Sequence, residues 1–306
     1  IIREEIDVVF GYPGGAILPA YDALNKYRDK IHHVLVRHEQ GATHMADGYA
    51  RASGKVGVAM ATSGPGATNM VTGLATAKLD SIPIVCITGQ VPRAAIGSDA
   101  FQEVDIYGTV LPVTKYSYLV MDIRDLASTI KEAFVVARSG RPGPVLIDIP
   151  KDIQNETIEF VYPDEPVKLP GNNRPIRVSE NQIEEAAHLI NNAKKPVILA
   201  GHGILLSGAS REIIQLAETA SIPIGWTLLG AGSVPASHPL NMGMMGMHGE
   251  FAVNNAIQDA DLLIACGMRF DDRVTGNVKT YSPNSKKIHI EIDPSEINKN
   301  VPVDVG

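Results

Sequence analysis

The apolar residues change their spacing within one stretch, Val34-Leu35-Val36-Arg37-His38-Glu39-Gln40-Gly41-Ala42-Thr43-His44-Met45-Ala46-Asp47-Gly48-Tyr49-Ala50-Arg51. Residues 34–36 form an apolar run typical of a strand. The apolar side chains that follow recur at helical spacing: Ala42, Met45, Ala46, Tyr49 and Ala50. Glu39 is therefore predicted at or near the carboxyl end of a strand. In open α/β sheets, ligands bind at that edge.

Two roles are open for the Glu39 carboxylate. With an apolar strand behind it, the group can be held partly desolvated and can share a proton with a basic ring nitrogen. Alternatively, it is an acid in the first turn of a helix, where its charge complements the helix dipole. The stretch alone is compatible with both roles.

Composition narrows the class of protein. The chain has 306 residues, of which 44% are hydrophobic, so we expect about two domains with sizeable cores. Mean hydropathy is +0.02, and no apolar run is long enough for a transmembrane helix. The net charge of −7 is spread along the chain without a basic patch, so nucleic acid and membrane are not expected partners.

The cysteines and the chain ends carry two further expectations. Cys86 and Cys266 each lie in an apolar strand-like run, so we predict buried free thiols and a reducing, cytoplasmic location. The sequence starts at Ile1 without an initiator methionine or signal peptide, and it stops in an apolar run. We expect an excerpt of a longer polypeptide.

Residues 1–152 alternate between strand-like and helix-like patterns. We predict strands at residues 7–10, 34–36, 56–61, 83–88 and 144–149, with helices at residues 16–27, 42–50, 66–79 and 125–138. Strands separated by helices imply a parallel sheet with right-handed crossovers. Residues 89–118 show little regular pattern and are predicted to form a long functional loop, in which Phe101 is either a core anchor or a pocket wall.

A proline-rich linker is predicted at residues 153–178, followed by a second unit at residues 179–306. Ser179 is a predicted helix N-cap. Helices are expected at residues 179–192, 209–220 and 251–258, and strands at residues 196–200, 222–227, 262–266 and 287–292. Glu291 and Asp293 would share one face of the last strand. The predicted fold class is α/β, with two doubly wound parallel-sheet domains joined by the linker.

Several turns allow either a ligand site or a plain structural role. Gly14-Gly15 suits close approach of a ligand or a tight turn. Gly64-Pro65-Gly66-Ala67-Thr68-Asn69 nearly matches a dinucleotide-binding pattern, although Asn69 replaces the last glycine. Residues 269–273 follow a predicted strand and form either part of a nucleotide site or an ion-paired turn. His202 is either a ligand contact or a loop histidine without a ligand. The methionines of residues 243–249 are core filler or ligand contacts.

Six motifs together carry a family resemblance. In chain order they are Phe10-Gly11-Tyr12-Pro13-Gly14-Gly15-Ala16, Arg37-His38-Glu39-Gln40-Gly41-Ala42, Thr62-Ser63-Gly64-Pro65-Gly66-Ala67-Thr68-Asn69, Asp99-Ala100-Phe101-Gln102-Glu103, Ser139-Gly140-Arg141-Pro142-Gly143-Pro144-Val145 and Arg269-Phe270-Asp271-Asp272-Arg273. With these motifs the whole chain resembles the catalytic subunit of the acetohydroxyacid synthase (acetolactate synthase) family. These are thiamine-diphosphate enzymes of branched-chain amino-acid synthesis.

The resemblance implies a domain plan. Residues 1–152 would bind the pyrimidine ring of thiamine diphosphate, and residues 179–306 would be an incomplete central domain that binds FAD. The third domain of the family, which holds the diphosphate and its magnesium, would lie outside this sequence, so no metal ligand is expected here. Gly201-His202-Gly203 departs from the family's usual all-glycine turn at His202.

The resemblance also implies roles for particular residues. Glu39 would be catalytic, because its bond to the aminopyrimidine ring favours the imino tautomer that takes the proton of the thiazolium carbon. Thiamine diphosphate would contact Tyr12, Pro13, Gly14, Gly15, Glu39, Pro65, Asn69 and Gln102. Substrate would contact Pro92, Phe101, Gln102, Lys151, Met244 and Arg273. FAD would contact Arg141, Gly201, His202, Gly203, Thr227, Leu228, Gly246, Met247, His248, Gly267, Arg269, Asp271, Arg273, Glu291 and Ile292.

The implied activity is decarboxylation of pyruvate and transfer of the two-carbon unit to a second 2-keto acid. The products would be 2-acetolactate or 2-aceto-2-hydroxybutyrate, and FAD would serve no net redox change. A homodimer or homotetramer is expected, with a small regulatory subunit as a candidate partner, and the fragment alone would be inactive. Two alternatives remain: another thiamine-diphosphate 2-keto-acid decarboxylase or oxidase, or a non-catalytic nucleotide-binding fragment.

Overall fold

The computed structural model describes residues 1–167, 169 and 178–306. The chain divides into two compact units, Ile1–Arg174 and Pro175–Gly306, and each is described by itself. Most of the predicted linker's second half, with Pro170, Gly171, Asn172, Asn173 and Pro175, lies outside the described residues.

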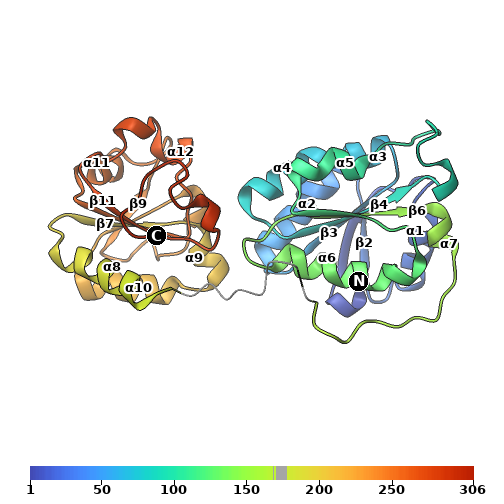
Figure 1. Cartoon of the computed structure of the whole chain (residues 1–306), viewed down its shortest axis with the longest axis horizontal. Helices are drawn as coiled ribbons and strands as arrows, with labels where there is room; N and C mark the ends of the chain where they lie inside the picture. Colours follow the sequence, from blue (N-terminus) through green and yellow to red (C-terminus); the bar gives the residue numbers. More distant parts are fainter. Residues whose placement is uncertain (168, 170–177) are drawn as a thin grey trace. The chain divides into compact units, whose positions relative to one another are not determined.

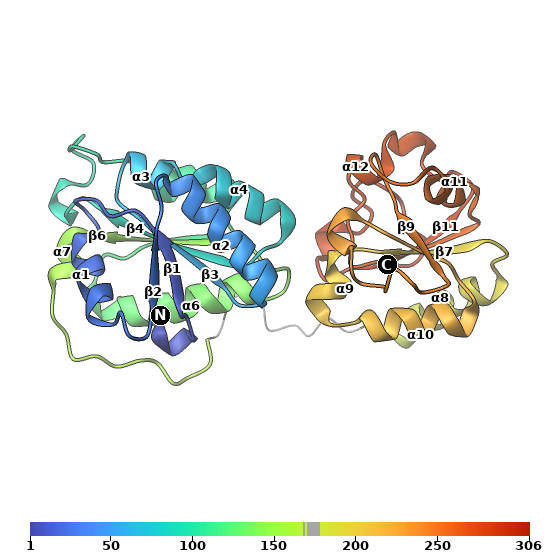
Figure 2. The ribbon, with the colours of Figure 1, turned by 180° about the vertical axis from the view of Figure 1, so that it is seen from behind.

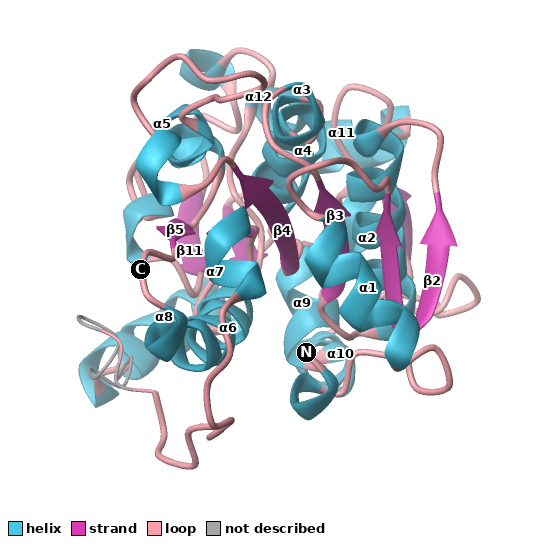
Figure 3. Cartoon of the chain, turned by 90° about the vertical axis from the view of Figure 1, so that its right-hand side faces the viewer, coloured by secondary structure: helices cyan, strands magenta, loops and turns pink. Residues whose placement is uncertain are grey.

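The first unit contains a six-stranded sheet, sheet A, with the strand order β2-β1-β3-β4-β6-β5. All its neighbouring strands are parallel, and Figure 3 shows the arrowheads of β2, β3 and β4 pointing the same way. The elements of the unit are β1 (Val8–Gly11), α1 (Leu18–Lys26), β2 (His32–Leu35), α2 (Glu39–Ser53), β3 (Gly57–Ala61), α3 (Pro65–Thr68), α4 (Val71–Asp80), β4 (Ile84–Gln90), α5 (Ile106–Val110), β5 (Tyr116–Leu119), α6 (Ile123–Arg138), β6 (Val145–Pro150) and α7 (Lys151–Asn155).

Both faces of sheet A are covered by helices, which is why its central strands are continuously apolar rather than alternating. Every residue of β3, β4 and β6 is buried. On β3, Val58 and Met60 point to the face that packs against α1, α6 and α7. Ala59 and Ala61 point to the opposite face, which α2, α3, α4 and α5 cover (Figure 1). Because successive side chains of a strand point to opposite faces, one apolar run contributes to the hydrophobic cores on both sides of the sheet.

The sequence of helix α2 explains where the helix begins and ends and which of its faces is buried. The ring Nδ1 of His38 accepts a hydrogen bond from the Gln40 amide at 3.1 Å and caps the start, and Gly54 ends the helix in the left-handed region at φ 71°. Ala42, Ala46 and Ala50 form its buried stripe. Their small size lets α2 lie so close to β3 that a Cβ on Gly57 would meet the Ala46 carbonyl oxygen at 2.0 Å.

The second unit contains a five-stranded parallel sheet, sheet B, with the order β11-β10-β7-β8-β9. Ser179 opens the unit with a complete capping box, as predicted. The elements are α8 (Glu180–Asn192), β7 (Pro196–Ala200), α9 (His202–Ser207), α10 (Ser210–Ala220), β8 (Ile224–Trp226), β9 (Asn241–Met244), α11 (Phe251–Asp259), β10 (Leu262–Cys266), α12 (Asp272–Thr275) and β11 (Lys286–Ile290).

Sheet B is also buried on both faces. Side chains of α8, α9 and α10 pack on one face together with Ile198 and Ile264. Val253 and Ile257 of α11 pack on the other face, on which Figure 2 also shows α12. The prediction of an α/β fold with two doubly wound parallel sheets is confirmed.

Several short elements were not predicted from the sequence. The region 89–118 contains α5 and β5, because β4 ends at Gln90 and the chain then returns to the edge of sheet A. Strand β5 has the sequence YSYL and lies at that edge, so it carries little apolar signal. Strand β9, with the sequence NMGM, lies at the other sheet's edge and has no β-branched residue. Helices α7 and α9 have only five and six residues, too few to show a helical period.

Two boundaries were also predicted wrongly. The helix expected at residues 66–79 is divided into α3 and α4 by Asn69 and Met70, although both residues keep right-handed helical angles. Strand β11 ends at Ile290, so Glu291 and Asp293 lie beyond it and share no strand face. There the Glu291 carboxylate accepts the amides of the next two residues, and the chain turns away from the sheet.

Cys86 and Cys266 are free and buried, as the sequence predicted. Burial in apolar strands raises the pKa of the Cys86 thiol, which keeps it protonated and unreactive. No helix in the described part of the chain is long and apolar enough to cross a membrane.

Candidate functional site

The strand order of sheet A reverses between β1 and β3, and open α/β sheets form a crevice at such a switch point. From β1 the chain moves outward to β2 and then returns to the other side of β1 as β3, so the loops at their carboxyl ends diverge. The loop after β1 carries Tyr12, Pro13, Gly14 and Gly15, and the loop after β3 leads into Pro65. Glu39 follows β2, the other neighbour of β1. Topology therefore brings the predicted thiamine-diphosphate residues to one edge of sheet A.

Glu39 is the first residue of α2 and is only 8% exposed. Its Oε2 accepts a hydrogen bond from Asn69 Nδ2 at 2.9 Å. A Cβ added to Gly66 would lie 3.4 Å from Oε1, so this turn passes close to the carboxylate. Glu39 is thus a first-turn acid, as one interpretation held. Interaction with the helix dipole alone, however, would not require that Glu39 is buried. Nor would it require a hydrogen bond from the side-chain amide of Asn69, which is 30 residues away in the sequence.

Tyr21 is a neighbour of Glu39 that the sequence analysis missed. Its hydroxyl is buried, and no hydrogen-bond partner for it exists among the described residues. Burial raises the pKa of Tyr21, and the negative charge of Glu39 raises it further, which places the two groups within electrostatic reach. A Cβ on Gly11 would lie 2.3 Å from the Tyr21 hydroxyl oxygen and 2.7 Å from the Met60 carbonyl oxygen, so there is no room for a side chain at Gly11.

Thr62 joins the turns that follow β1 and β3. Its Oγ1 accepts a hydrogen bond from the Ala16 amide at 3.1 Å. A Cβ on Gly14 would lie 2.5 Å from Thr62 Cγ2, whereas Gly15 has open space where a side chain would be. Packing therefore explains Gly14 as a tight-turn glycine. Gly15 leaves backbone accessible at the crevice.

The loop after β4 reaches the same edge. Gly64 has φ 59° and ψ −121°, and a Cβ there would lie 2.6 Å from the carbonyl oxygen of Gln102. The Gln102 backbone therefore rests on the turn that leads to Asn69. The neighbouring Phe101 side chain is 88% exposed, so Phe101 is not a core anchor of this unit. Pro92 and Lys151 follow the paired ends of β4 and β6 at this edge.

Arg141 is the predicted site residue of the first unit that lies elsewhere. It precedes β6 and therefore sits near the amino ends of the strands, opposite to Glu39. Its Nε donates to the Ser81 hydroxyl at 2.7 Å. Within the first unit, Arg141 is not part of the group around Glu39.

Sheet B has its own crevice between β7 and β10, where the strand order again reverses direction. The turns after these strands interlock through glycines. The Gly203 amide donates to the Gly267 carbonyl at 2.8 Å, and a Cβ on Gly203 would lie 2.6 Å from the Gly267 Cα. A Cβ on Gly201 would lie 2.3 Å from the Gly267 carbonyl oxygen. His202 between them is the first residue of α9.

Further predicted FAD residues surround this crevice. The Thr227 amide donates to the Ala200 carbonyl at 3.0 Å at the end of β7, with Leu228 exposed beside it. The Met247 amide donates to the Arg273 carbonyl at 2.7 Å, while His248 is exposed. A pocket of about 270 Å³ adjoins them. It is lined by Gly246, Met247, Asn254, Ile257, Gln258, Asp272, Arg273, Val274, Thr275, Gly276 and Tyr281.

The segment 269–273 combines an ion-paired turn with an exposed cation. Asp271 caps α12 by accepting the amides of Arg273 and Val274 at 2.9 and 3.3 Å, and it pairs with Arg269 Nε at 3.4 Å. The Arg273 side chain remains 69% exposed, with Met247 Sδ 3.5 Å from its Nη1. Met244 ends β9 in this unit, and Ile292 follows Glu291 after β11. No group of three or more metal-ligating side chains occurs among the residues described.

Both units match known protein families. The family model described as the thiamine pyrophosphate enzyme N-terminal TPP binding domain matches residues 1–109. The model described as the thiamine pyrophosphate enzyme central domain matches residues 183–306. The chain belongs to the thiamine pyrophosphate enzyme family.

The chain is also similar to individual proteins that are named acetolactate synthases. The chain is 51% identical to a probable acetolactate synthase large subunit of Methanocaldococcus jannaschii, over 99% of this chain and 51% of the relative. It is 53% identical to an acetolactate synthase large subunit of Corynebacterium glutamicum, over 98% of this chain and 47% of the relative. It is 52% identical to an acetolactate synthase of Arthrospira platensis, over 99% of this chain and 53% of the relative. The chain thus spans about half the length of these relatives.

Proposed function

We propose that the chain is the N-terminal and central part of an acetolactate synthase catalytic subunit. The whole enzyme decarboxylates pyruvate and transfers the two-carbon unit to a second 2-keto acid, giving 2-acetolactate or 2-aceto-2-hydroxybutyrate. This is the first shared step of branched-chain amino-acid synthesis. The observation that carries the proposal is the buried Glu39 carboxylate, held by Asn69 at the β1/β3 crevice. The similarity to acetolactate synthases supports it.

The residues around Glu39 fit the pyrimidine half of thiamine diphosphate. One carboxylate oxygen is oriented by Asn69, no hydrogen bond to Oε1 is found among the described residues, and Gly15 leaves open space beside the turn. When bound, thiamine diphosphate supplies a carbon nucleophile that attacks the keto carbon of pyruvate and accepts the electron pair released with carbon dioxide. Glu39 holds and returns a proton at the pyrimidine ring nitrogen, a role that its burial strengthens because water does not compete.

The loop after β4 is proposed to form the entrance for substrate. Phe101 offers an exposed apolar ring, and Gln102 is fixed on the Gly64 turn. Pro92 and Lys151 add an apolar and a cationic group at the same edge of sheet A. In the second unit, Met244 and Arg273 are also proposed to contact substrate. The exposed guanidinium of Arg273 is suited to bind the carboxylate of the second keto acid in a bidentate manner.

The second unit is proposed to bind FAD at the β7/β10 crevice, without a net redox role. Turns rich in glycine and polar groups at a strand-order reversal support this, because dinucleotides bind at such points. Magnesium and the diphosphate are assigned to a further domain. Because two of the relatives are named large subunits, we also propose a small regulatory partner subunit, in addition to a homodimer or homotetramer in the cytoplasm.

A product assay on the full-length protein tests the proposed activity. With pyruvate, thiamine diphosphate, magnesium and FAD, we expect acetolactate as the main product and bound flavin after gel filtration. Acetaldehyde or acetate as the main product would instead indicate the decarboxylase or oxidase alternative. No turnover of any 2-keto acid would contradict an enzymatic role.

Asp271→Ala in the full-length protein should weaken flavin binding by about tenfold or more, the effect of losing one hydrogen bond to a charged group. The substitution also removes the N-cap of α12, so a control for lost capping is needed. Asn277→Ala is that control, since Asn277 caps a neighbouring short helix by accepting the Lys279 amide at 3.1 Å. Flavin dissociation constants are the measurement. Equal values for wild type and Asp271→Ala would contradict the assignment.

A further inference from the structure

A buried polar cluster lies beneath the loop after β4 and is not used in the chemistry proposed above. It consists of Thr88 and Gln90 on β4 and of Asp148 on β6, which are at most 4% exposed. Thr88 and Asp148 are direct partners in the parallel ladder. Thr88 Oγ1 donates to Asp148 Oδ1 at 2.7 Å, and Gln90 Nε2 donates to Asp148 Oδ2 at 2.9 Å. Both carboxylate oxygens are thus engaged by neutral donors.

The Gln90 side chain connects this cluster to both ends of the loop. Its Oε1 accepts the amide of Val91, the first loop residue, at 2.8 Å. Its Nε2 also donates to the carbonyl of Val104, near the last loop residue, at 2.9 Å. One buried amide therefore closes a segment of 14 residues, 91–104, which includes Phe101 and Gln102.

We propose that Gln90, oriented by Asp148, is a positioning residue that keeps this loop in place for substrate. By joining Val91 to Val104 it holds the Gln102 backbone on Gly64 and thereby presents Phe101 at the edge where Glu39 lies. The substrate role of the loop rests on the proposed function. The closure of the loop by Gln90 does not.

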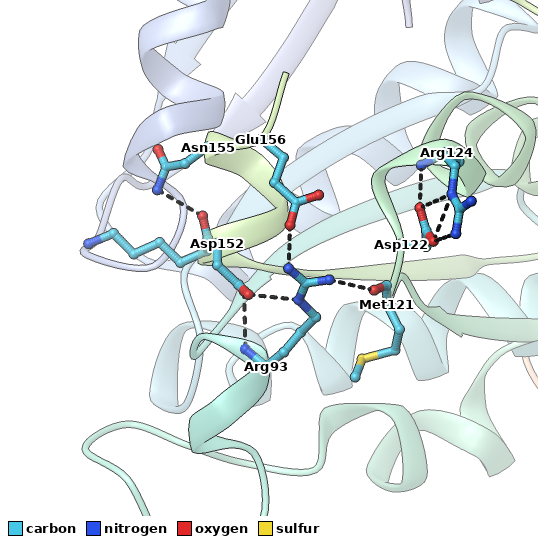
Figure 4. A network of polar contacts seen from close by, with 8 residues as sticks. Arg93, Met121, Asp122, Arg124, Asp152, Asn155 and Glu156 are labelled. Atoms are coloured by element: carbon cyan, nitrogen blue, oxygen red, sulfur yellow. Dashed lines mark hydrogen bonds and ion pairs between the residues drawn. The ribbon is translucent and has the colours of Figure 1, made fainter. Parts of the chain in front are cut away.

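Two other anchors stiffen the loop but are partly exposed to water. Arg93 points toward Asp152 and Glu156 of the α7 segment (Figure 4). Its Nε donates to Asp152 Oδ2 at 2.7 Å, and its Nη1 donates to the Met121 carbonyl at 3.1 Å. Glu103 accepts amides from within the loop, at 2.9 Å for Ala100. Because water can replace exposed partners but not buried ones, the Gln90 contacts should dominate.

Gln90→Leu has similar size but cannot donate, so it leaves Asp148 Oδ2 and the Val104 carbonyl unpaired. If the docked fraction of the loop falls to about one tenth, the apparent KM for pyruvate rises about tenfold, since apparent affinity scales with the competent fraction. Asp148→Asn is the conservative variant, which should still orient Gln90. Its side-chain oxygen can accept from Gln90, and its NH₂ group can donate to the Thr88 hydroxyl.

Amide hydrogen exchange of residues 96–105 in the full-length protein measures loop closure without any substrate. We expect exchange in Gln90→Leu to rise about tenfold, and the KM for pyruvate to rise about tenfold with kcat changed less. Asp148→Asn should behave like wild type in both measurements. Thr114→Val is the matched control, because it deletes a buried hydrogen bond of the same unit, to the Val110 carbonyl at 2.9 Å, outside the loop. It should leave both readouts unchanged.

The outcomes separate loop closure from substrate positioning. Wild-type exchange in Gln90→Leu would overturn the proposal, and so would faster exchange with an unaltered KM. If the wild-type protein makes no acetolactate, the proposed function fails, whereas faster loop exchange in Gln90→Leu would still support closure by Gln90. Should Gln90→Leu fail to fold, Gln90→Asn keeps an amide that is one methylene too short for Val104, and the same results are expected of it.

Discussion

Glu39→Gln in the full-length protein should lower the rate of acetolactate formation by about 10²- to 10⁴-fold, the usual contribution of a general acid–base group. Glutamine keeps the size of the side chain and can still accept the hydrogen bond of Asn69 Nδ2. It cannot hold and return a proton at the pyrimidine ring nitrogen. The loss should therefore fall on proton transfer, with the fold of α2 retained.

Hydrogen–deuterium exchange at the thiazolium carbon of saturating thiamine diphosphate is the deciding measurement for Glu39. We expect it to slow together with the rate. Asp47→Asn is a control on the same helix, since Asp47 is also buried but pairs with Arg51 at 2.6 Å. If Glu39 only complemented the helix dipole, its loss would cost about 1 kcal/mol of stability or less. An unchanged rate of exchange at the thiazolium carbon in Glu39→Gln would show that Glu39 only complements the helix dipole.

Asp148→Asn should become more stabilising, relative to wild type, as the pH rises. The pKa of the Asp148 carboxyl is raised from 3.8 to about 7, mainly by burial and to a smaller extent by the charge of Asp105, while hydrogen bonds from Thr88 and Gln90 oppose the rise. Between these two pKa values the folded state holds a proton that the unfolded state has released. Stability of the wild type is therefore lost as the pH rises through this window, by up to about 4 kcal/mol.

Thermal midpoints of wild type and variant between pH 5 and 8 check this expectation, because titrations common to both proteins cancel in the difference. The gap should widen with pH and level off above about 7, where Asp148 is fully charged. Asp122→Asn is the matched control. Its pKa is lowered to about 2 by hydrogen bonds and charge from Arg124, so it does not titrate in this range. A gap between wild type and Asp148→Asn that is independent of pH would contradict the raised pKa.

Most of the secondary structure was predictable because it depends on local spacing. Apolar runs bounded by turns marked β3, β4 and β6, and caps such as Ser179 marked helix ends. The edge strands β5 and β9 were not predictable in this way. An edge strand buries less of its surface, so its sequence need not be apolar.

The candidate site was predicted only in part. Glu39 at a strand end, the glycine turns and Asn69 were marked by local pattern and by the family resemblance. Tyr21 and Gln90 were not marked in either way, and Thr62 stood in a family motif without a predicted role. The signal available for the buried cluster was weak: a single acid, Asp148, inside an apolar strand, and two polar residues spaced by two on β4.

The sequence by itself determined that Glu39 lies where a strand of a parallel sheet gives way to a helix, because strand and helix periods are properties of neighbouring residues. Only the tertiary structure decided its surroundings. Three contacts of the site join parts of the chain that are between 14 and 38 residues apart. They are the hydrogen bond from Asn69 to Glu39, the packing of the Gln102 backbone on Gly64, and the hydrogen bond from Gln90 to the Val104 carbonyl. Which loops meet depends on strand order, and strand order is set by the packing of whole helices on both sheet faces.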